Sequence, residues 1–502
     1  MANQSTQASI LADVKHFSLI VPERIALVDC NREITYNQLQ REITTVQALL
    51  RDRYNVKHAD RVGVFTENTI DCVVIMLAII SLSAIAVIIN TKLAQIEIDY
   101  IIYDSKPMLI AIGNNEHMQH IQSKVPFFKI AEINHALMMN NNIVCFSDAY
   151  QALDPAFIIY TSGTTGHPKG AMITHRNLAH SAYSYTKSLG LIEEDSTIIA
   201  APLFYVTSLI AQLMTFLSIG AKSILMHRFD EYKMARSIEY YHITHLHAVA
   251  TIYIRFLTAI TQKKFNLTSI RQVLCGGGPI TTLLIEKLKA VLPNIEFRRI
   301  YGLTESSGTG CVMPVDSLLR PDKPISSGLP MPEVELKVVD DEGLVELPPD
   351  VPGELWIKGP IVIESYWNNP EANCRSFTDG WLKTGDIARI DHDGYVFILD
   401  RKKDMIIRGG EKVFSSEVEV ALALHPGVSE VAVVGIPDEY YGEAVKAYIV
   451  ASAGASLSAE DIIRFARRRL AKFKVPTSIE FVIQLPRSPV GKVLKSSLRG
   501  DK

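Results

Sequence analysis

The sequence predicts an α/β protein: a large N-terminal domain of layered α/β subdomains, a small β-rich subdomain, and a C-terminal α+β domain. Two patterns predict this class. Short apolar, β-branched runs alternate with amphipathic stretches over most of the chain, and from about Pro332 polar and apolar residues begin to alternate. Buried strands between helices are typical of mainly parallel sheets, whereas alternation is typical of antiparallel strands with one solvated face.

The expected elements follow in chain order. The buried strands of the N-terminal part are RVGVF, AVIIN, LIAIG, AFIIY, STIIAA, AKSILM and RQVLCGG. In the β-rich part, VELKVVDDEGLVEL, GELWIKG and GYVFILD are joined at DEG and HDG turns. The charged stretch DRKKDMIIRGG then suits a hinge, which gives domains 1–400 and 404–502 with a hinge at 401–403.

Two helices are expected in the C-terminal domain. Ser416 and Glu419 have capping-box spacing, which predicts a helix that begins near Glu417 and ends before Pro426. A second helix is expected to begin at Ser458 and to run through IIRFARRRLAKF.

Composition excludes several classes of protein. The 502 residues are 48% hydrophobic, enough for a large core, and the net charge of −3 predicts no nucleic-acid partner and no attraction to anionic lipid. Six cysteines without a CxxC pair predict buried free thiols in a reducing compartment. The start lacks a signal-peptide pattern, so the chain is expected to be cytoplasmic. The apolar run 73–89 is at the short limit for a membrane span, and a buried helix followed by a buried strand is expected instead.

The segment YTSGTTGHPKGAM concentrates hydroxyl residues, glycines and a lysine directly after the apolar run AFIIY. Backbone N–H groups of a glycine-rich loop can surround phosphate oxygens, and Lys169 adds a positive charge. A P-loop NTPase would need Ser or Thr after that lysine, but Gly170 follows it, so that class is rejected. A plain surface turn is the remaining alternative, and an anion-binding loop is expected.

With this loop, TSGTTGHPKG, the chain resembles the adenylate-forming superfamily of acyl- and aryl-CoA synthetases, luciferases and adenylation domains. Further motifs of that superfamily follow in order: YGLTE at 301–305, GWLKTGD at 380–386, DRKKDMI at 400–406 and PRSPVGKVLK at 486–495. The match closest in detail is to fatty-acyl and related CoA ligases. The resemblance implies that ATP and Mg²⁺ activate a carboxylic acid as acyl-AMP, and that coenzyme A then takes the acyl group.

The resemblance also implies a role for particular residues. The β- and γ-phosphates would lie on Thr161, Ser162, Gly163, Thr164, Thr165, Gly166 and Lys169. Adenosine would be held by Tyr301, which stacks on adenine, and by Gly302, Gly276, Gly277, Gly278, Asp386 and Arg401. Thr304 would contact the α-phosphate, and Glu305 would hold Mg²⁺ together with Thr165. The acid pocket would include Tyr205, Val206, His247 and Gly276.

The C-terminal domain would supply the catalytic lysine. In the superfamily this domain is mobile: it turns between the two half-reactions, and a lysine near its end approaches the carboxylate and the α-phosphate. Lys492 occupies that position, Lys403 occupies the hinge position, and Gly410 would lie beside the passage for the thiol. Loss of one such charge should cost roughly 10²- to 10³-fold in rate.

Some positions depart from the usual pattern. Tyr205 replaces a common histidine in PLFYVTSL, and this segment holds no acid to pair with a substrate ammonium group, so a carboxylic acid without an α-amino group is expected. Ser365 stands where glycine is usual and Ser415 where proline is usual, and neither is expected to touch the chemistry. A medium- or long-chain fatty acid is the first substrate expected and an aryl acid the second. The phosphopantetheine arm of a carrier protein acting in trans is the alternative acceptor to coenzyme A.

Overall fold

The computed structural model describes residues 9–113, 125–130, 132, 150–161, 168–278, 280, 282–323, 325–452, 454–487 and 493–499. The chain forms two compact units. The first unit comprises Met1–Leu336 and Ile357–Lys383, and the second comprises Lys337–Trp356 and Thr384–Lys502. The predicted hinge at 401–403 therefore lies within the second unit, and its role stays a prediction.

One sheet of the first unit contains the strands expected before the glycine-rich loop. Its order is β6-β5-β3-β4-β7-β8, and its pairs are parallel except for antiparallel β7–β8. The strands are β3 (Arg61–Phe65), β4 (Ile85–Ile88), β5 (Leu109–Ile112), β6 (Phe127–Lys129), β7 (Pro155–Thr161) and β8 (Lys169–Thr174). The predicted loop lies between β7 and β8, which form a hairpin at the edge of the sheet.

The long apolar run is a buried helix and a buried strand, as expected. Helix α3 (Ile70–Ser81) begins at Thr69, whose hydroxyl accepts the N–H of Cys72, and strand β4 follows it. The side chains of α3 and β4 are almost all buried. Those of α3 share one core with Ala86 and Ile88 of β4, whereas Ile85 and Val87 belong to a second core on the other face of the strand. Among the described residues, no helix combines the length and the apolar character needed to cross a bilayer.

The second sheet of this unit has the order β15-β14-β13-β12-β11-β9-β10-β1-β2. Its strands are β1 (Ile25–Val28), β2 (Glu33–Thr35), β9 (Ser196–Ile199), β10 (Lys222–Leu225), β11 (His245–Ala248), β12 (Gln272–Cys275), β13 (Glu296–Gly302), β14 (Gly310–Val312) and β15 (Leu329–Pro330). The pairs from β1 to β13 are parallel, and those at the two ends are antiparallel. The carboxyl ends of β11, β12 and β13 therefore share one edge, where α/β sheets commonly bind ligands.

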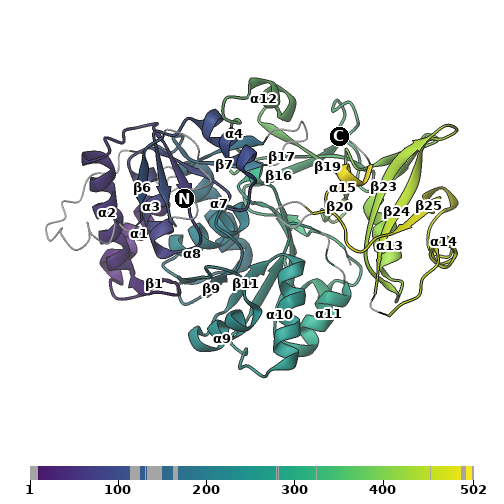
Figure 1. Cartoon of the computed structure of the whole chain (residues 1–502), viewed down its shortest axis with the longest axis horizontal. Coiled ribbons are helices and arrows are strands. Elements are labelled where there is room, and N and C mark those ends of the chain that lie inside the picture. The colour runs from purple at the N-terminus through teal and green to yellow at the C-terminus, as the bar shows by residue number, and fades with distance from the viewer. Residues whose placement is uncertain are drawn as a thin grey trace. The chain divides into compact units, whose positions relative to one another are not determined.

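Helices cover the sheets of the first unit. Figure 1 shows α9, α10 and α11 beside the nine-stranded sheet, where their apolar side chains share a core with β9, β11 and β12. The helical segments are α1 (Ile10–Ile20), α2 (Tyr36–Asp52), α4 (Gln95–Ser105), α7 (His175–Leu189), a π-helix (Thr207–Met214), α8 (Thr215–Ser218), α9 (Glu231–Tyr241), α10 (Ala250–Gln262), α11 (Thr282–Val291) and α12 (Pro370–Ser376). Short 3₁₀ turns lie at Thr304–Ser306 and Ser317–Leu319.

The β-rich segment expected after Pro332 is present. It comprises β16 (Glu335–Val339), β17 (Gly353–Lys358), β18 (Phe377–Thr378), β19 (Trp381–Ile390) and β20 (Val396–Arg401). The predicted DEG and HDG turns place Gly343 and Gly394 at φ of 73° and 82°, which favours glycine. The chain passes between the two units within β16, β17 and β19.

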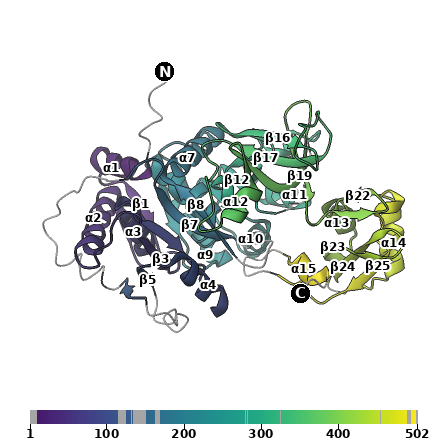
Figure 2. The same ribbon diagram turned by 90° about the horizontal axis from the view of Figure 1, so that it is seen from above.

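The second unit contains the expected α+β arrangement. Its sheet has the order β22-β21-β24-β23, with β25 also paired to β24, and Figure 2 shows α13 and α14 beside these strands. The elements are β21 (Ile406–Arg408), β22 (Glu411–Val413), α13 (Ser415–Ala423), β23 (Val428–Asp438), β24 (Gly442–Ala451), α14 (Ala459–Arg467), a 3₁₀ turn (Lys472–Lys474), β25 (Ser478–Phe481) and α15 (Lys495–Arg499).

Two helix predictions need correction. Ser416 and Glu419 form no capping box: α13 begins at Ser415, the Ser416 hydroxyl donates to the carbonyl of Leu399, and the Glu419 carboxylate accepts the N–H of Val433. The cap of α14 is as predicted, because the Ser458 hydroxyl accepts the N–H of Asp461. That helix ends at Arg467 rather than continuing through AKF.

The free thiols also differ from expectation in their exposure. Of the described cysteines, those at 72, 275 and 311 are buried, and those at 30 and 374 are exposed.

Candidate active site

The described ends of the predicted phosphate loop are held by the β7–β8 hairpin. Thr161 is paired with Lys169 across the two antiparallel strands, and both side chains are half-buried. The hairpin therefore presents Lys169 at the base of the loop. The predicted phosphate ligands Ser162, Gly163, Thr164, Thr165 and Gly166 lie outside the described residues.

The YGLTE motif at 301–305 is connected to this hairpin by the segment around Tyr366, to which the sequence analysis assigned no role. The segment around Tyr366 is anchored on both sides: the N–H of Trp367 donates to the carbonyl of Gly170 over 2.7 Å, and the N–H of Ile363 donates to the carbonyl of Glu305 over 2.9 Å. It therefore joins β8 to the YGLTE motif, although the three pieces are far apart in the sequence.

Tyr366 lies between two of the predicted functional groups. Its hydroxyl donates to Glu305 Oε1 over 2.9 Å, and Lys169 Nζ is 5.3 Å from the centre of its ring. Burial raises the pKa of the Tyr366 hydroxyl, and the neighbouring Glu305 carboxylate raises it further, so the hydroxyl stays a donor near neutral pH. Tyr366 thus orients the predicted Mg²⁺ ligand and contacts the predicted phosphate-binding cation.

The residues around Glu305 form a tight turn at the end of β13. Gly302 ends that strand, and Thr304 and Glu305 lie on the 3₁₀ turn that follows it. A Cβ atom at Gly302 would lie 2.3 Å from the carbonyl oxygen of Gly308, so only glycine allows this approach of the backbone. Tyr301, Gly302, Thr304 and Glu305 are all half-buried, which suits groups that meet a ligand.

The three predicted glycines follow β12 at the shared edge of the sheet. A Cβ atom at Gly276 would lie 2.7 Å from both Cγ2 and the carbonyl oxygen of Ile300, so this glycine packs directly against β13. Gly277 has a φ of 77°, and a Cβ atom at Gly278 would meet nothing within 4 Å. This glycine segment therefore leaves open space above the edge of the sheet at Gly278.

The predicted acid-pocket residues fall into one neighbourhood. A Cβ atom at Gly308 would lie 3.4 Å from Val206, and the carbonyl of Gly308 accepts the hydroxyl of Tyr185 over 2.6 Å. The ring of Tyr185 is 6.1 Å from that of His247, between centroids. Val206 and His247 thus lie on either side of a Gly308–Tyr185 contact. Gly276 joins them through β12, whose Leu274 pairs with His247.

Two polar side chains of this neighbourhood are held in unusual states. Burial lowers the pKa of His247 to about 4, so the imidazole is neutral at pH 7. Burial raises the pKa of Tyr205 to about 12, and its buried hydroxyl has no hydrogen-bond partner among the described residues. A buried donor without a partner is costly, which suits a position that meets a ligand.

The predicted ribose residues belong to the second unit. Asp386 on β19 is paired in register with Arg401 on β20, and Arg401 Nε lies 2.7 Å from Asp386 Oδ1. The carboxylate is buried, with 2% of the side chain exposed, whereas 44% of the arginine side chain is exposed. The structure therefore brings these two predicted residues together as an ion pair.

The remaining predicted residues lie on exposed backbone. Lys403 is in the turn after β20, where the N–H of Asp404 donates to the carbonyl of Arg401. Gly410 lies between β21 and β22 with a φ of 87°, and a Cβ atom there would meet nothing within 4 Å. The exposure of Lys403 suits a hinge, and the open space at Gly410 suits a passage for the thiol. Both roles stay predictions. Lys492 lies outside the described residues.

Comparisons with known proteins identify the family of the chain. A family model for AMP-binding enzymes matches residues 19–367, and a model for the C-terminal domain of AMP-binding enzymes matches residues 417–492. The chain therefore belongs to the family of AMP-binding enzymes. It is an acid–thiol ligase of the AMP-forming class, as the superfamily resemblance implied.

The similar proteins include CoA ligases for different acids. The chain is 32% identical over 483 residues to a 2-succinylbenzoate–CoA ligase of Bacillus mycoides (strain KBAB4), and the match covers 96% of each protein. The o-succinylbenzoate coenzyme A synthetase of Bacillus subtilis, solved with ATP and magnesium ion, superposes with a TM-score of 0.88 at 31% identity, covering 97% of this chain and 98% of that one. A fatty acyl CoA synthetase of Mycobacterium tuberculosis gives 0.77 at 30% identity, covering 98% of each.

Proposed function

We propose that this enzyme activates an aromatic carboxylic acid with ATP and transfers the acyl group to coenzyme A, and that 2-succinylbenzoate is the first candidate substrate. The observation that carries the proposal is the similarity to 2-succinylbenzoate–CoA ligases along 96% of the chain. This reverses the order of substrates expected from the sequence, where a fatty acid came first and an aryl acid second.

The predicted acid-pocket residues support an acid that also carries a polar group. A neutral His247 can donate one hydrogen bond to a keto or carboxylate oxygen without bringing a charge of its own. The Tyr205 hydroxyl, which lacks a partner among the described residues, is a second group available to such an oxygen.

The reaction joins two anions, so its barrier is largely electrostatic. In the first step a carboxylate oxygen attacks the α-phosphorus of ATP, the bond to the bridging oxygen breaks, and pyrophosphate leaves. In the second step the thiol sulfur attacks the acyl carbon, AMP leaves, and the thiol proton passes to solvent. We propose that Lys169 and the 161–166 loop stabilise the negative charge of the leaving pyrophosphate. Lys492 and Thr304 would stabilise the charge that develops at the α-phosphate.

Residues of three predicted motifs would hold the nucleotide. Tyr301 would stack on adenine, while Asp386 would accept hydrogen bonds from the ribose hydroxyls, with its carboxylate fixed by Arg401. Mg²⁺ commonly uses one or two carboxylates and completes its coordination with water and phosphate oxygens. Glu305 with its Tyr366 hydrogen bond fits that requirement, and the ion when bound would neutralise phosphate charge.

The experiment is acid-dependent ATP–pyrophosphate exchange, with hydroxylamine trapping of the acyl-adenylate. The panel contains 2-succinylbenzoate, benzoate, octanoate and palmitate, each with and without coenzyme A. We expect exchange with 2-succinylbenzoate and coenzyme-A-dependent release of AMP. Preference for octanoate or palmitate would overturn the aromatic substrate, and absence of exchange with every acid would count against acid activation.

A carrier-protein phosphopantetheine arm is the alternative acceptor. The same reaction without coenzyme A, supplied with a phosphopantetheinylated carrier protein, tests it. Acyl transfer to the carrier but not to coenzyme A would replace the proposed acceptor.

A further inference from the structure

The segment that carries the predicted catalytic lysine is closed at its base. Arg487 and Val493 form an antiparallel bridge, and the N–H of Leu494 donates to the carbonyl of Pro486 over 2.8 Å. Residues 488–492 between them are outside the described part of the chain. Lys492 therefore directly precedes a residue that is fixed in a backbone ladder.

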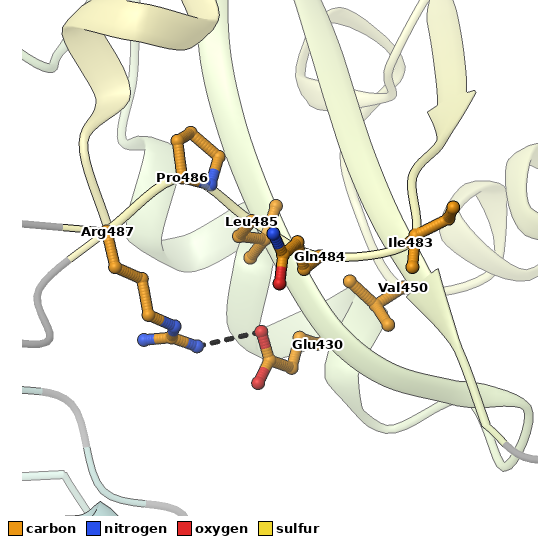
Figure 3. Close-up of a pocket in the computed structure, with 7 residues that line it drawn as sticks. All are labelled: Glu430, Val450, Ile483, Gln484, Leu485, Pro486 and Arg487. Carbon is orange, nitrogen blue, oxygen red and sulfur yellow. Dashed lines mark hydrogen bonds and ion pairs between the residues drawn. The ribbon is translucent and has the colours of Figure 1, made fainter.

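The first end of this segment is anchored to β23. Arg487 Nη2 lies 2.7 Å from Glu430 Oε2, as the dashed line in Figure 3 marks. The four residues before Arg487, 483–486, line a hollow of about 470 Å³ together with Glu430 and Val450. Glu430 and Val450 are paired across strands β23 and β24. Both groups of the ion pair are partly exposed, so this contact alone is a weak anchor.

The second end is held far more strongly. Helix α15 begins at Lys495, whose Nζ lies 2.7 Å from Glu419 Oε1 and 2.7 Å from Ser415 Oγ. Only 16% of the lysine side chain and 17% of the glutamate side chain are exposed. At the other end of α15, Arg499 lies 2.5 Å from Asp404. Buried charges are stabilised only when they are paired, so Lys495 is confined to this position.

Ser415 connects this ion pair to the residue before the predicted hinge. The N–H of Ser415 donates to Asp400 Oδ2 over 2.5 Å, and its hydroxyl donates to the same carboxylate over 2.8 Å. All of these groups belong to the second unit, and both Ser415 and Asp400 are buried. The chain from Asp400 through Ser415 to Lys495 is thus a continuous set of charge-assisted hydrogen bonds.

This link depends on a residue that departs from the family pattern. Proline, which is usual at position 415, has no N–H and no hydroxyl, so it could make neither contact with Asp400. Ser415 was not expected to touch the chemistry, but the structure places it between Asp400 and Lys495.

We propose that Lys495 and Ser415 are positioning residues for the adenylation half-reaction. Lys495 follows Lys492 by three positions, so its pairing with Glu419 anchors the chain shortly after the predicted catalytic lysine. Ser415 connects the Lys495–Glu419 ion pair to Asp400, the residue before the predicted hinge. The inference rests on the proposed function, because it concerns the lysine that adenylation requires. A displacement of about 1 Å in a catalytic group can cost roughly 10²-fold in rate.

The test separates the two half-reactions. Acid-dependent ATP–pyrophosphate exchange with 2-succinylbenzoate reports adenylation, and thioester formation from supplied 2-succinylbenzoyl-AMP and coenzyme A reports the second step. We expect Lys495→Met to lower exchange by about 10²-fold and to leave the second step unchanged. Lys495→Arg should restore most of the exchange, because it keeps the charge beside Glu419.

Two further variants keep the inference falsifiable if Lys495→Met folds poorly. Ser415→Pro removes both contacts with Asp400 at the first position of α13, where proline is tolerated, and should lower exchange by about 10-fold. Lys474→Met is the matched control, because Lys474 also pairs with α13 over 2.7 Å, through Glu417, but belongs to the 3₁₀ turn at Lys472–Lys474 rather than to α15.

The outcomes distinguish the inference from the function on which it rests. If the wild type exchanges pyrophosphate and Ser415→Pro or Lys495→Met behaves like the Lys474 control, the positioning role is wrong. Equal loss of both half-reactions would also overturn it, because that is the signature of general damage to the fold. If the wild type shows no acid-dependent exchange, the proposed function fails, and the inference fails with it.

Discussion

Removal of the Tyr366 hydroxyl should weaken adenylation through Glu305. The hydroxyl donates to Glu305 Oε1 over 2.9 Å, and a hydrogen bond to a charged group contributes about 1.5–3 kcal/mol. At 1.36 kcal/mol for each factor of ten, Tyr366→Phe should lower kcat/KM by about 10- to 150-fold if Glu305 loses its orientation. Glu305 is only half-buried, so water can replace part of the contact, and a loss of about 10-fold is expected.

The assay is ATP–pyrophosphate exchange measured as a function of Mg²⁺ concentration. We expect Tyr366→Phe to raise the Mg²⁺ concentration required for half-maximal rate. Its ring keeps the contact with Lys169, 5.3 Å from Nζ, which contributes about 0.5–1 kcal/mol. Tyr366→Leu should lose both contacts and be slower still.

The matched control is Tyr54→Phe, because Tyr54 also donates to a glutamate, Glu132, over 2.9 Å but lies outside the candidate site. The reasoning is refuted if Tyr366→Phe has wild-type rate and Mg²⁺ dependence, or if the control shifts the Mg²⁺ dependence equally.

Three other predictions follow from burial and backbone geometry. Burial holds the pKa of His247 and of His175 at about 4, below the unfolded value. Each neutral imidazole should therefore contribute roughly 3 kcal/mol to the free energy of unfolding above pH 6.5, and this contribution is lost as the pH falls from 6.5 to 4. In urea unfolding at pH 7.5 and pH 5, His247→Phe should lose less free energy of unfolding between the two pH values than the wild type. Gly410→Leu should slow thioester formation from supplied acyl-AMP more than pyrophosphate exchange, and equal rates of both would exclude the passage. Gly276→Ala should cost about 1–3 kcal/mol in thermal unfolding, because its Cβ would lie 2.7 Å from the carbonyl oxygen of Ile300; an unchanged melting temperature would exclude that packing.

The parts of the fold that were predictable are those governed by local patterns. The run 73–89, which forms most of α3 and all of β4, is apolar apart from two serines, because both elements are almost entirely buried. The cap of α14 at Ser458 was predictable because both of its hydrogen-bonding groups lie within one turn.

Other features depend on contacts between distant parts of the chain. The spacing of Ser416 and Glu419 indicated a capping box, but Glu419 pairs with Lys495 and accepts the N–H of Val433, and Ser416 donates to Leu399. Both side chains therefore bind tertiary partners instead of forming the local capping box. The spacing of residues in the sequence could not reveal these tertiary contacts.

The candidate site was predictable as a set of motifs but not as a set of contacts. Glu305 and Lys169 each belong to a recognisable motif, while Tyr366, which contacts both, lies in a segment with no chemical signature of its own. Its aromatic ring directly after the unusual Ser365 was the one signal that could have drawn attention to it. Its role follows from the two backbone hydrogen bonds that hold that segment against β8 and against the 3₁₀ turn after β13.

In the proposed mechanism Lys492 acts in adenylation but not in thioester formation, and Lys492→Ala tests this separation most directly. Pyrophosphate exchange with 2-succinylbenzoate and thioester formation from the supplied adenylate are measured on the same preparation. We expect exchange to fall by roughly 10²- to 10³-fold while thioester formation remains near the wild-type rate. Exchange at the wild-type rate, or equal loss of both steps, would contradict the account.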